Sequence, residues 1–267
     1  MLMPNNSENE TYLVDTGTGY SKLHHLSDGA RRIVRSKDLP LELEGKQVGL
    51  ACGHNASRFS SSTVNELIAL ARGARKLAGD YDFTVIDTGS RDIKYVHMFG
   101  FDIKRIDWNT ECGAFAGQVI ELLIDHFGFD TAAIEPADEP IPVACGVLGM
   151  TAMFDLIAKD VAPERAFARF IKGVADNIWR FAGKPDRFYL SGGLCENRLF
   201  VRSFKGIDVV PLGRFVLVEG LMEEYKDKNK LRPLQKDTKE LGTGELFDIH
   251  NFNMRIKSGK KYPRPQF

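Results

Sequence analysis

Short apolar runs in the first part of the chain predict strands that are joined by glycine-rich turns. The run 12–15 ends in Asp15-Thr16-Gly17-Thr18-Gly19, and residues 21–26 predict the strand that returns beside it. Glycine tolerates the backbone angles that such a tight hairpin requires. A second run, 83–87, closes in the same way on Thr88-Gly89-Ser90 and is again followed by an apolar segment. This strand–turn–strand unit occurs twice, about seventy residues apart, and predicts an internal duplication.

Apolar residues at helical spacing predict the remaining elements. Ser62 or Thr63 is expected to cap a helix over 64–77, because hydroxyl side chains accept hydrogen bonds from the first helical N–H groups. Pro163 suits the first turn of another helix. Further helices are predicted over 113–127, 146–158, 164–181 and 215–225, and further strands over 47–52, 188–190 and 209–210. Strands interleaved with helices predict an α/β fold.

The composition is that of an ordinary globular protein. Of 267 residues, 43% are hydrophobic and 27% charged, and 36 acidic side chains balance 36 basic ones. A net charge of zero argues against a general nucleic-acid binder. No apolar run approaches the roughly 20 residues of a membrane span, and the polar start lacks a signal-peptide pattern. We therefore expect a cytoplasmic protein without membrane or nucleic-acid partners. The Lys-rich segment from Lys226 onward is expected to be a solvated extension.

The two Asp-Thr-Gly turns suit a nucleotide. Glycine lets backbone N–H groups approach phosphate oxygens, because no Cβ stands in the way. An aspartate at the end of the preceding strand, such as Asp15, can hold Mg²⁺ through water. With Asp87 at the equivalent place in the second turn, one aspartate would orient the metal and the other would position the attacking water. Gly192-Gly193, after a late strand, would let an adenine ring lie flat against the backbone.

Two of the four cysteines precede predicted apolar helices. Cys112 and Cys145 are each followed by glycine and then by a helix, whose N-terminal field stabilises a thiolate. A [4Fe–4S] cluster needs four thiolates, so two per chain would require a symmetric dimer, and a zinc ion shared in this way is a chemical alternative. Cys52 and Cys195 are expected to be packed thiols, Cys195 near the adenine.

Together these motifs resemble one family of ATPases. They are Asp15-Thr16-Gly17-Thr18-Gly19-Tyr20-Ser21-Lys22, Ile86-Asp87-Thr88-Gly89-Ser90-Arg91-Asp92-Ile93-Lys94, the two cysteine segments, and Leu190-Ser191-Gly192-Gly193-Leu194-Cys195-Glu196-Asn197. In this order they are similar to the activators of 2-hydroxyacyl-CoA dehydratases and the ATPase subunits of benzoyl-CoA reductase. That family lies in the superfamily of actin, sugar kinases and heat-shock protein 70. The similarity runs from about residue 12 to residue 225.

The resemblance implies duplicated ribonuclease-H-like lobes with a cleft between them. A trimmed first lobe would cover 1–82, a second lobe 83–225, and a basic extension 226–267. It also implies a homodimer with one bridging [4Fe–4S] cluster, held by Cys112 and Cys145 of each subunit. ATP hydrolysis would change the angle between the helices that carry the cluster. An electron from a ferredoxin or flavodoxin would then reach a partner dehydratase or reductase metalloenzyme in an anaerobic cell.

The matching motifs also imply a set of site residues for ATP and Mg²⁺. Asp15 and Asp87 would be catalytic, and Asp15 and Asp92 would hold Mg²⁺, through water where needed. Asp92 alternatively caps its turn, and Lys22 and Lys94 are either phosphate contacts or ordinary strand-edge cations. The implied nucleotide contacts are Gly17, Thr18, Gly19, Lys22, Gly89, Ser90, Lys94, Gly192, Gly193 and Asn197.

The chain departs from the family pattern next to both cluster cysteines. It has Phe115-Ala116-Gly117 where the family has Gly-Thr-Gly, and Leu148-Gly149-Met150-Thr151-Ala152 where the family has an acidic stretch. The change from acidic to apolar residues indicates a different partner or a divergent member. Two alternatives stay open: a small-molecule kinase of the same superfamily, and a non-redox ATPase scaffold or assembly protein.

Overall fold

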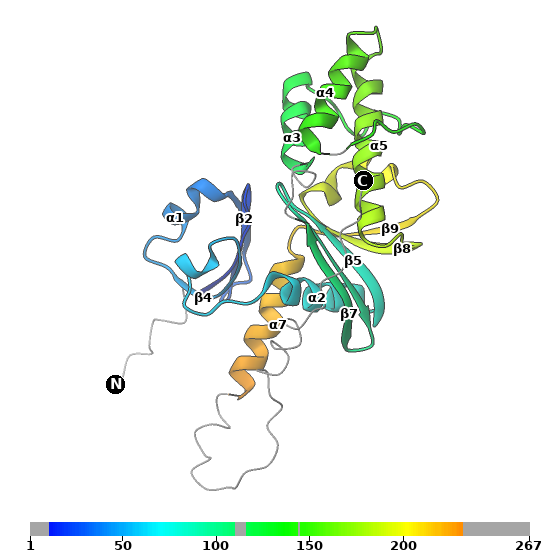
Figure 1. Ribbon diagram of the computed structural model, residues 1–267. Coiled ribbons are helices and arrows are strands. Elements are labelled where there is room, and N and C mark those ends of the chain that lie inside the picture. The colour runs from blue at the N-terminus through cyan, green and yellow to red at the C-terminus, as the bar shows by residue number, and fades with distance from the viewer. Residues whose placement is uncertain (1–10, 110–115, 144, 232–267) are drawn as a thin grey trace, which may run out of the picture. The chain divides into compact units, whose positions relative to one another are not determined.

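The computed structural model describes residues 11–109, 116–143 and 145–231 (Figure 1). The chain divides into two compact units, of which the first is Met1–Lys228 and the second is Asn229–Phe267. The elements described below belong to the first unit, apart from the last residues of the final helix. Cys112 and Phe115 lie outside the described residues.

The first sheet contains four strands in the order β3-β2-β1-β4. Strand β1 (Thr11–Thr16) pairs antiparallel with β2 (Tyr20–His25), which pairs antiparallel with β3 (Arg31–Arg35). Strand β4 (Gln47–Gly53) lies parallel to β1 on its other side. Successive side chains of a strand point to opposite faces. Accordingly, Leu13 and Val14 are both fully buried but belong to different apolar clusters.

The second sheet repeats this layout and adds one strand, in the order β7-β6-β5-β8-β9. The antiparallel strands are β5 (Asp82–Thr88), β6 (Ile93–Phe99) and β7 (Asp102–Asn109). The parallel strands are β8 (Arg187–Gly192) and β9 (Asp208–Gly213). Each sheet contains an antiparallel meander of three strands, and a further strand pairs in parallel with the first strand of that meander. This shared topology confirms the predicted duplication.

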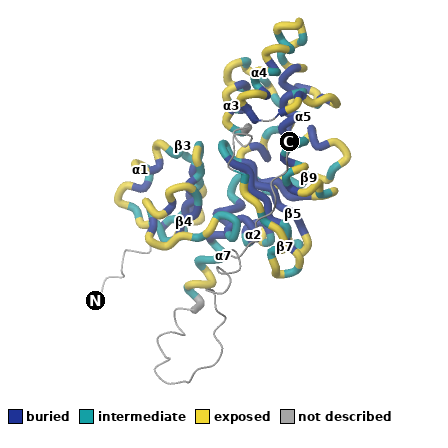
Figure 2. The backbone as a smooth tube through the Cα atoms, viewed as in Figure 1, coloured by how far each residue is buried: buried dark blue, intermediate teal, exposed yellow. Residues whose placement is uncertain are grey.

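Helices α3 (Ala116–Phe127), α4 (Gly146–Ile157) and α5 (Pro163–Phe181) form a group beside the second sheet (Figure 1). The core that joins these helices and the sheet contains fully buried phenylalanines, among them Phe167 and Phe170 of α5 and Phe188 of β8. Figure 2 shows buried residues concentrated along the strands around β5. The short helices α1 (Leu39–Glu42) and α6 (Arg198–Arg202) complete the two lobes.

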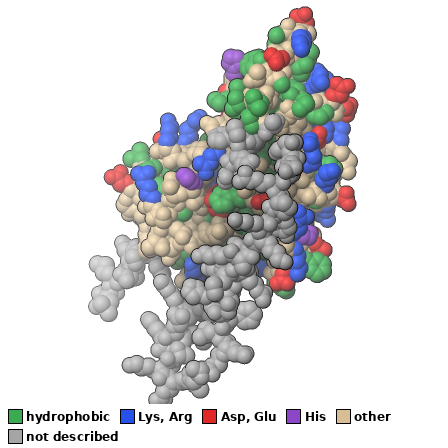
Figure 3. Space-filling model, viewed as in Figure 1, with side chains coloured by type: hydrophobic (Ala, Val, Ile, Leu, Met, Phe, Trp, Pro, Cys, Tyr) green, Lys and Arg blue, Asp and Glu red, His purple; other side chains and the backbone are tan. Residues whose placement is uncertain are grey.

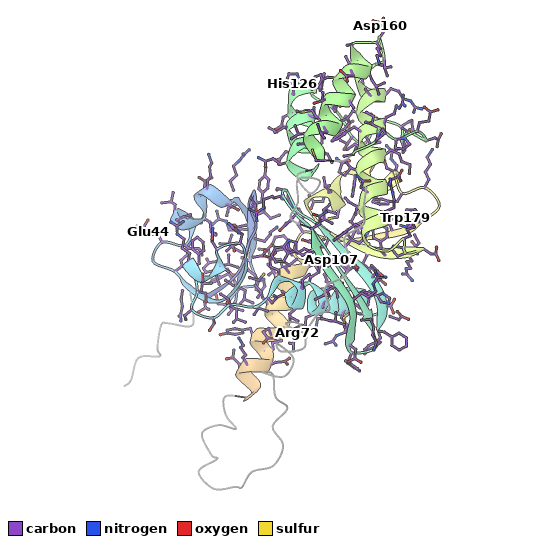
Figure 4. The ribbon with its side chains drawn as sticks, viewed as in Figure 1. Glu44, Arg72, Asp107, His126, Asp160 and Trp179 are labelled. Atoms are coloured by element: carbon purple, nitrogen blue, oxygen red, sulfur yellow. The ribbon has the colours of Figure 1, made fainter. Side chains whose placement is uncertain are left out.

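Helix α2 (Glu66–Ala78) packs closely against α7 (Val216–Leu231). A Cβ on Gly73 would lie 1.8 Å from the Val216 carbonyl oxygen, and one on Gly220 would lie 1.9 Å from that of Ala69. The two glycines therefore allow a backbone approach that no other residue permits. Arg72 of α2 strengthens this contact, since its guanidinium lies 2.8 Å from Asp227 of α7 (Figure 4).

Three details differ from the sequence predictions: the cap of α2, two additional strands, and the end of α7, which continues to Leu231 rather than ending at residue 225. Helix α2 is capped by Asn65 rather than by Ser62 or Thr63, because the Asn65 side chain accepts the Leu67 N–H at 2.8 Å. Strands β3 and β7 were not predicted, and β3 and α1 occupy the segment between β2 and β4. Both strands lie at sheet edges, where charged residues obscure the alternation of apolar positions. No helix in the described ranges is long and apolar enough to cross a membrane.

Candidate functional site

The two glycine turns and the end of β8 border one pocket. A Cβ on Gly19 would lie 2.6 Å from Ser90 Oγ, so the first turn directly faces the second. The pocket brings together every predicted nucleotide contact except Asn197, as well as Asp15, Asp87 and Asp92. Its lining residues are Asp15, Thr16, Gly17, Thr18, Gly19, Tyr20, Lys22, His54, Glu66, Asp87, Gly89, Ser90, Asp92, Lys94, Gly192, Gly193, Arg214 and Leu217.

The first turn carries a buried ion pair. Asp15 at the end of β1 lies opposite Lys22 of β2, and Lys22 Nζ is 3.0 Å from Asp15 Oδ2. The other carboxylate oxygen, Oδ1, is 3.9 Å from the thiol of Cys52, which is a weak donor. Burial alone would lower the pKa of Lys22, but the carboxylates of Asp15 and Asp87 outweigh it and raise that pKa. Lys22 is therefore a fixed cation within the pocket.

The second turn holds a larger charge cluster. Lys94 Nζ lies 2.7 Å from Glu66 Oε2 and 3.1 Å from Asp92 Oδ1. Asp92 Oδ2 accepts the Trp108 indole N–H at 2.9 Å, so both oxygens of this carboxylate have protein partners. Burial would lower the pKa of Lys94, but the neighbouring carboxylates Asp87, Glu66 and Asp92 raise it.

The two lysines are not strand-edge cations. Lys22 stands on β2 and Lys94 on β6, and each of these strands has a neighbour on both sides. The side chains of Lys22 and Lys94 are only 14% and 4% exposed. Burying a charge is costly unless it is paired, and their carboxylate partners provide that pairing here.

Asp87 occupies the place in β5 that Asp15 occupies in β1. Its Oδ1 accepts the Ser191 hydroxyl at 2.7 Å, and within the described residues Oδ2 has no hydrogen-bond donor. Burial raises the pKa of Asp87, while Lys94 and Ser191 act against that rise. Asp15 and Asp87 thus each have one carboxylate oxygen that accepts no strong hydrogen bond from the described residues. Both carboxylate oxygens of Asp92, in contrast, have partners.

The charges of the pocket suit a metal–phosphate complex. Its lining contains four carboxylates, those of Asp15, Glu66, Asp87 and Asp92, against the three permanent cations Lys22, Lys94 and Arg214. A phosphate anion alone would meet an excess of negative charge. A hard divalent cation that is bound together with the phosphates would remove this excess, and Mg²⁺ prefers carboxylate oxygens and water.

The late Gly-Gly motif joins the same pocket through its backbone. Gly192 has φ +90°, and a Cβ there would lie 2.3 Å from the Thr88 carbonyl oxygen. Gly193 has no atom within 4 Å of the position of a Cβ, so a planar ring has access to its backbone. Asn197 instead caps α6, since its Oδ1 accepts the Phe200 N–H at 3.0 Å, and it does not line the pocket.

Four lining residues lie outside the sequence motifs, and they are His54, Glu66, Arg214 and Leu217. His54 follows β4, Glu66 begins α2, Arg214 follows β9, and Leu217 lies in α7. Each of them lies at the pocket because distant elements pack together. The spacing of residues in the sequence does not predict such contacts. A glutamate immediately after a helix cap was the only available signal for Glu66.

The second turn is also connected to helix α3. The Gln118 N–H donates to the Ser90 carbonyl oxygen at 2.9 Å, and a Cβ on Gly117 would lie 2.3 Å from the Gly89 carbonyl oxygen. Gly117 is the one glycine that this chain shares with the family's Gly-Thr-Gly run after the first cysteine. Here it allows the helix backbone to contact the turn. The start of α3 is therefore fixed to the candidate phosphate site.

Cys145 caps helix α4. Its backbone is extended, and the Leu148 N–H donates to its Sγ at 3.4 Å. The residue is 9% exposed. Within the described ranges no three His, Cys, Asp or Glu side chains form a metal-binding group. Cys52 and Cys195 are buried thiols, as expected from the sequence.

A separate hollow of about 490 Å³ lies at the far end of α3 and the start of α5. It is bordered by Phe127, Phe129, Asp130 and Arg165, among others. None of the motif residues borders this hollow, so it is not connected with the predicted nucleotide site.

Solved structures show the same fold. The activator of 2-hydroxyisocaproyl-CoA dehydratase from Clostridium difficile, with bound ADPNP, aligns at a TM-score of 0.71 and 18% identity over 87% of this chain and 100% of that one. Component A of (R)-2-hydroxyglutaryl-CoA dehydratase from Acidaminococcus fermentans aligns at 0.67 and 18% identity over 82% and 98%. A putative 2-dehydro-3-deoxygalactonokinase from Sinorhizobium meliloti aligns at 0.52 and 13% identity over 82% and 99%.

No protein-family model and no curated protein matches the sequence. The structural matches confirm the actin-like α/β fold and, at the level of the fold, the resemblance to dehydratase activators.

Proposed function

We propose that the chain is an ATP-hydrolysing activator that drives a low-potential electron from a [4Fe–4S] cluster onto a partner metalloenzyme. The observation that carries this proposal is the pocket between two equivalent glycine turns. In that pocket Asp15 and Asp87 each keep one oxygen that no strong donor of the described residues occupies.

The residues of the pocket have distinct roles in this proposal. The N–H groups of the two turns cradle the phosphates, and Lys22 and Lys94 supply fixed positive charge beside them. Asp15 holds Mg²⁺, and Asp92 contributes through water or by fixing Lys94. Asp87, whose pKa burial raises, positions the attacking water. Gly192 and Gly193 receive the adenine, and Asn197 acts only by capping the helix beside them.

Cys112 and Cys145 of each subunit would hold the cluster in a homodimer. The capping geometry of Cys145 fits a thiolate ligand, because a backbone N–H already points at Sγ and the helix N-terminus favours negative charge. When bound, the cluster supplies one-electron transfer at low potential. Cys145 caps α4, so a movement of that helix changes the position of its thiol, and Cys112 precedes α3 in the sequence.

The partner is a 2-hydroxyacyl-CoA dehydratase or benzoyl-CoA reductase type of enzyme, or a divergent target, with a ferredoxin or flavodoxin as electron donor. Val147 and Leu148, which follow Cys145, are 48% and 60% exposed. Leu122 of α3 and Phe154 of α4 are exposed as well, and Figure 3 shows hydrophobic side chains in the region of α3 and α4. An apolar surface next to the cluster favours a partner that differs from one recognised by acidic residues.

A small-molecule kinase is the second candidate. The structural match to a putative sugar-acid kinase favours it, and it would leave the two cysteines without a shared role. A scaffold with an inactive nucleotide site is less consistent with the intact charge cluster around Asp15 and Lys94.

Anaerobic purification tests the proposal. We expect a brown dimer with about four irons and four acid-labile sulfides per two chains, and with Mg²⁺-dependent ATPase activity. An iron-free monomer that phosphorylates a sugar or an acid would replace this proposal with the kinase. A folded protein that binds no nucleotide would favour the scaffold.

A further inference from the structure

A hydrogen bond joins the first glycine turn to helix α3. Tyr20, the first residue of β2, lines the pocket immediately after Gly19. Its hydroxyl donates to a carboxylate oxygen of Glu121 on α3. The two residues are 101 positions apart in the sequence, so this contact directly connects the two repeated units.

Two arginines hold the Tyr20 ring in place. The Arg214 guanidinium lies 5.2 Å from the ring centroid and that of Arg35 lies 5.8 Å from it. Both distances are within the range of a cation–π contact. Arg214 also lines the pocket, and its ion pair with the exposed Glu196 is long, at 3.6 Å. A phosphate that attracts Arg214 would therefore also change the support of the Tyr20 ring.

Helix α3 is held by the opposite turn as well. Gln118 N–H donates to the Ser90 carbonyl oxygen, and Glu121 lies three residues further, on the neighbouring turn of the same helical face. One turn of α3 is thus fixed to the second glycine turn and the next is fixed to the first. A change in the separation of the two turns must move α3 or break one of these contacts.

We propose that Tyr20 is a positioning residue that transmits the nucleotide state to α3 through its hydrogen bond with Glu121. This inference rests on the proposed function and adds a regulatory contact to it. The two turns already meet at Gly19 and Ser90, so a nucleoside triphosphate with Mg²⁺ bound against them changes their separation, and the diphosphate restores it. The Tyr20–Glu121 bond converts this change in separation into a movement of α3, which follows Cys112 in the sequence.

Hydrogen exchange of the full-length, anaerobically purified dimer tests the inference. The exchange rates of the amides of residues 116–127 are measured with and without Mg²⁺–ADPNP. The nucleotide is saturating, so that variants with different affinities for it can be compared. In the wild type we expect nucleotide to slow exchange in α3 by about threefold or more. Glu121→Ala should lose most of this response, whereas Glu121→Gln, which keeps an oxygen acceptor, should retain it. Tyr20→Phe should lose it as Glu121→Ala does.

Asp125→Ala is the matched control, since Asp125 is an exposed acid one turn further along α3. It should respond like the wild type. A full α3 response in Glu121→Ala would overturn the inference and leave the proposed function intact. So would a wild type that binds ADPNP without any response in α3. A wild type that binds no ADPNP would overturn the inference and the proposed function together.

Discussion

Lys22 Nζ lies 3.0 Å from Asp15 Oδ2, on neighbouring strands and at the floor of the pocket between the two glycine turns. Lys22 thereby neutralises one side of the carboxylate and fixes its orientation. The other oxygen remains directed at a weak thiol donor. A carboxylate that keeps one oxygen free of strong donors can hold a hydrated Mg²⁺ ion.

Replacing Asp15 by Ala should therefore abolish ATP turnover without affecting the cluster. We expect phosphate release to fall by about a hundredfold or more, since charge stabilisation in the site is lost. Iron content should stay at the wild-type value, because the cysteines are not involved. Asp28→Ala, on the exposed loop after β2, is the control and should hydrolyse ATP normally. Normal hydrolysis by the Asp15 variant would show that the phosphate site is wrongly assigned.

Lys94 should contribute strongly to stability. Replacing it by Met leaves the buried carboxylate of Asp92 and the partly buried carboxylate of Glu66 without their cation. Loss of one partner from such a buried cluster typically costs about 3–5 kcal/mol of unfolding free energy. Lys104→Met, which removes a half-exposed lysine paired with Asp102, should cost about 1 kcal/mol or less. Urea unfolding measures both, and similar values for the two variants would refute the role of Lys94.

The ionised side chain of Asp87 should lower the free energy of unfolding at neutral pH, although the proposed reaction uses it. Its folded-state pKa is raised by burial, so the penalty for its charge is fully present above that pKa. The penalty fades as pH falls through the raised pKa toward the ordinary value of 3.8. Asp87→Asn, which removes this charge, should thus raise Tm at pH 7.

Two observations check this account of Asp87. The gain in Tm should shrink as pH is lowered from about 7 to about 4, and ATP turnover by Asp87→Asn should be lost at every pH. A gain that grows on acidification would mean that burial does not raise the pKa of Asp87. Asp125→Asn, at an exposed position, should change neither Tm nor turnover.

The buried thiols should be unreactive. Burial, followed by the charge of Glu196, raises the pKa of Cys195 to about 11. At pH 8 about one molecule in a thousand then carries the reactive thiolate. Burial and Asp15 also raise the pKa of Cys52 well above its usual range. Iodoacetamide at pH 8 should modify both cysteines only in urea, as peptide mass spectrometry would show. Rapid modification of the folded protein would mean that these thiols are accessible.

The sequence predicted the parts of this molecule that depend on local patterns. The hairpins around Gly17 and Gly89, and the helices with continuous apolar faces such as α5, are specified by neighbouring residues. The edge strands β3 and β7 were missed, because only one neighbouring strand constrains them and their side chains are largely charged.

The candidate site was only partly predictable for a related reason. The carboxylates and glycines of the two turns stand in recognisable order, and the structure brings them into one pocket. The pairing of Lys94 with Glu66, and that of Tyr20 with Glu121, depend on how distant elements pack, which spacing alone does not reveal. The domain limits at 82 and 225 and the cluster ligand Cys112 stay predictions.

The most direct test of the central claim is the rate at which a chelator removes iron from the anaerobically purified dimer. We predict about four irons per dimer and a rate of iron release that changes several-fold on addition of Mg²⁺–ATP, because nucleotide closure moves the helices that hold the cluster. Cys145→Ser should contain little iron and should be monomeric. Protein without iron, or iron release that is indifferent to nucleotide, would contradict the account.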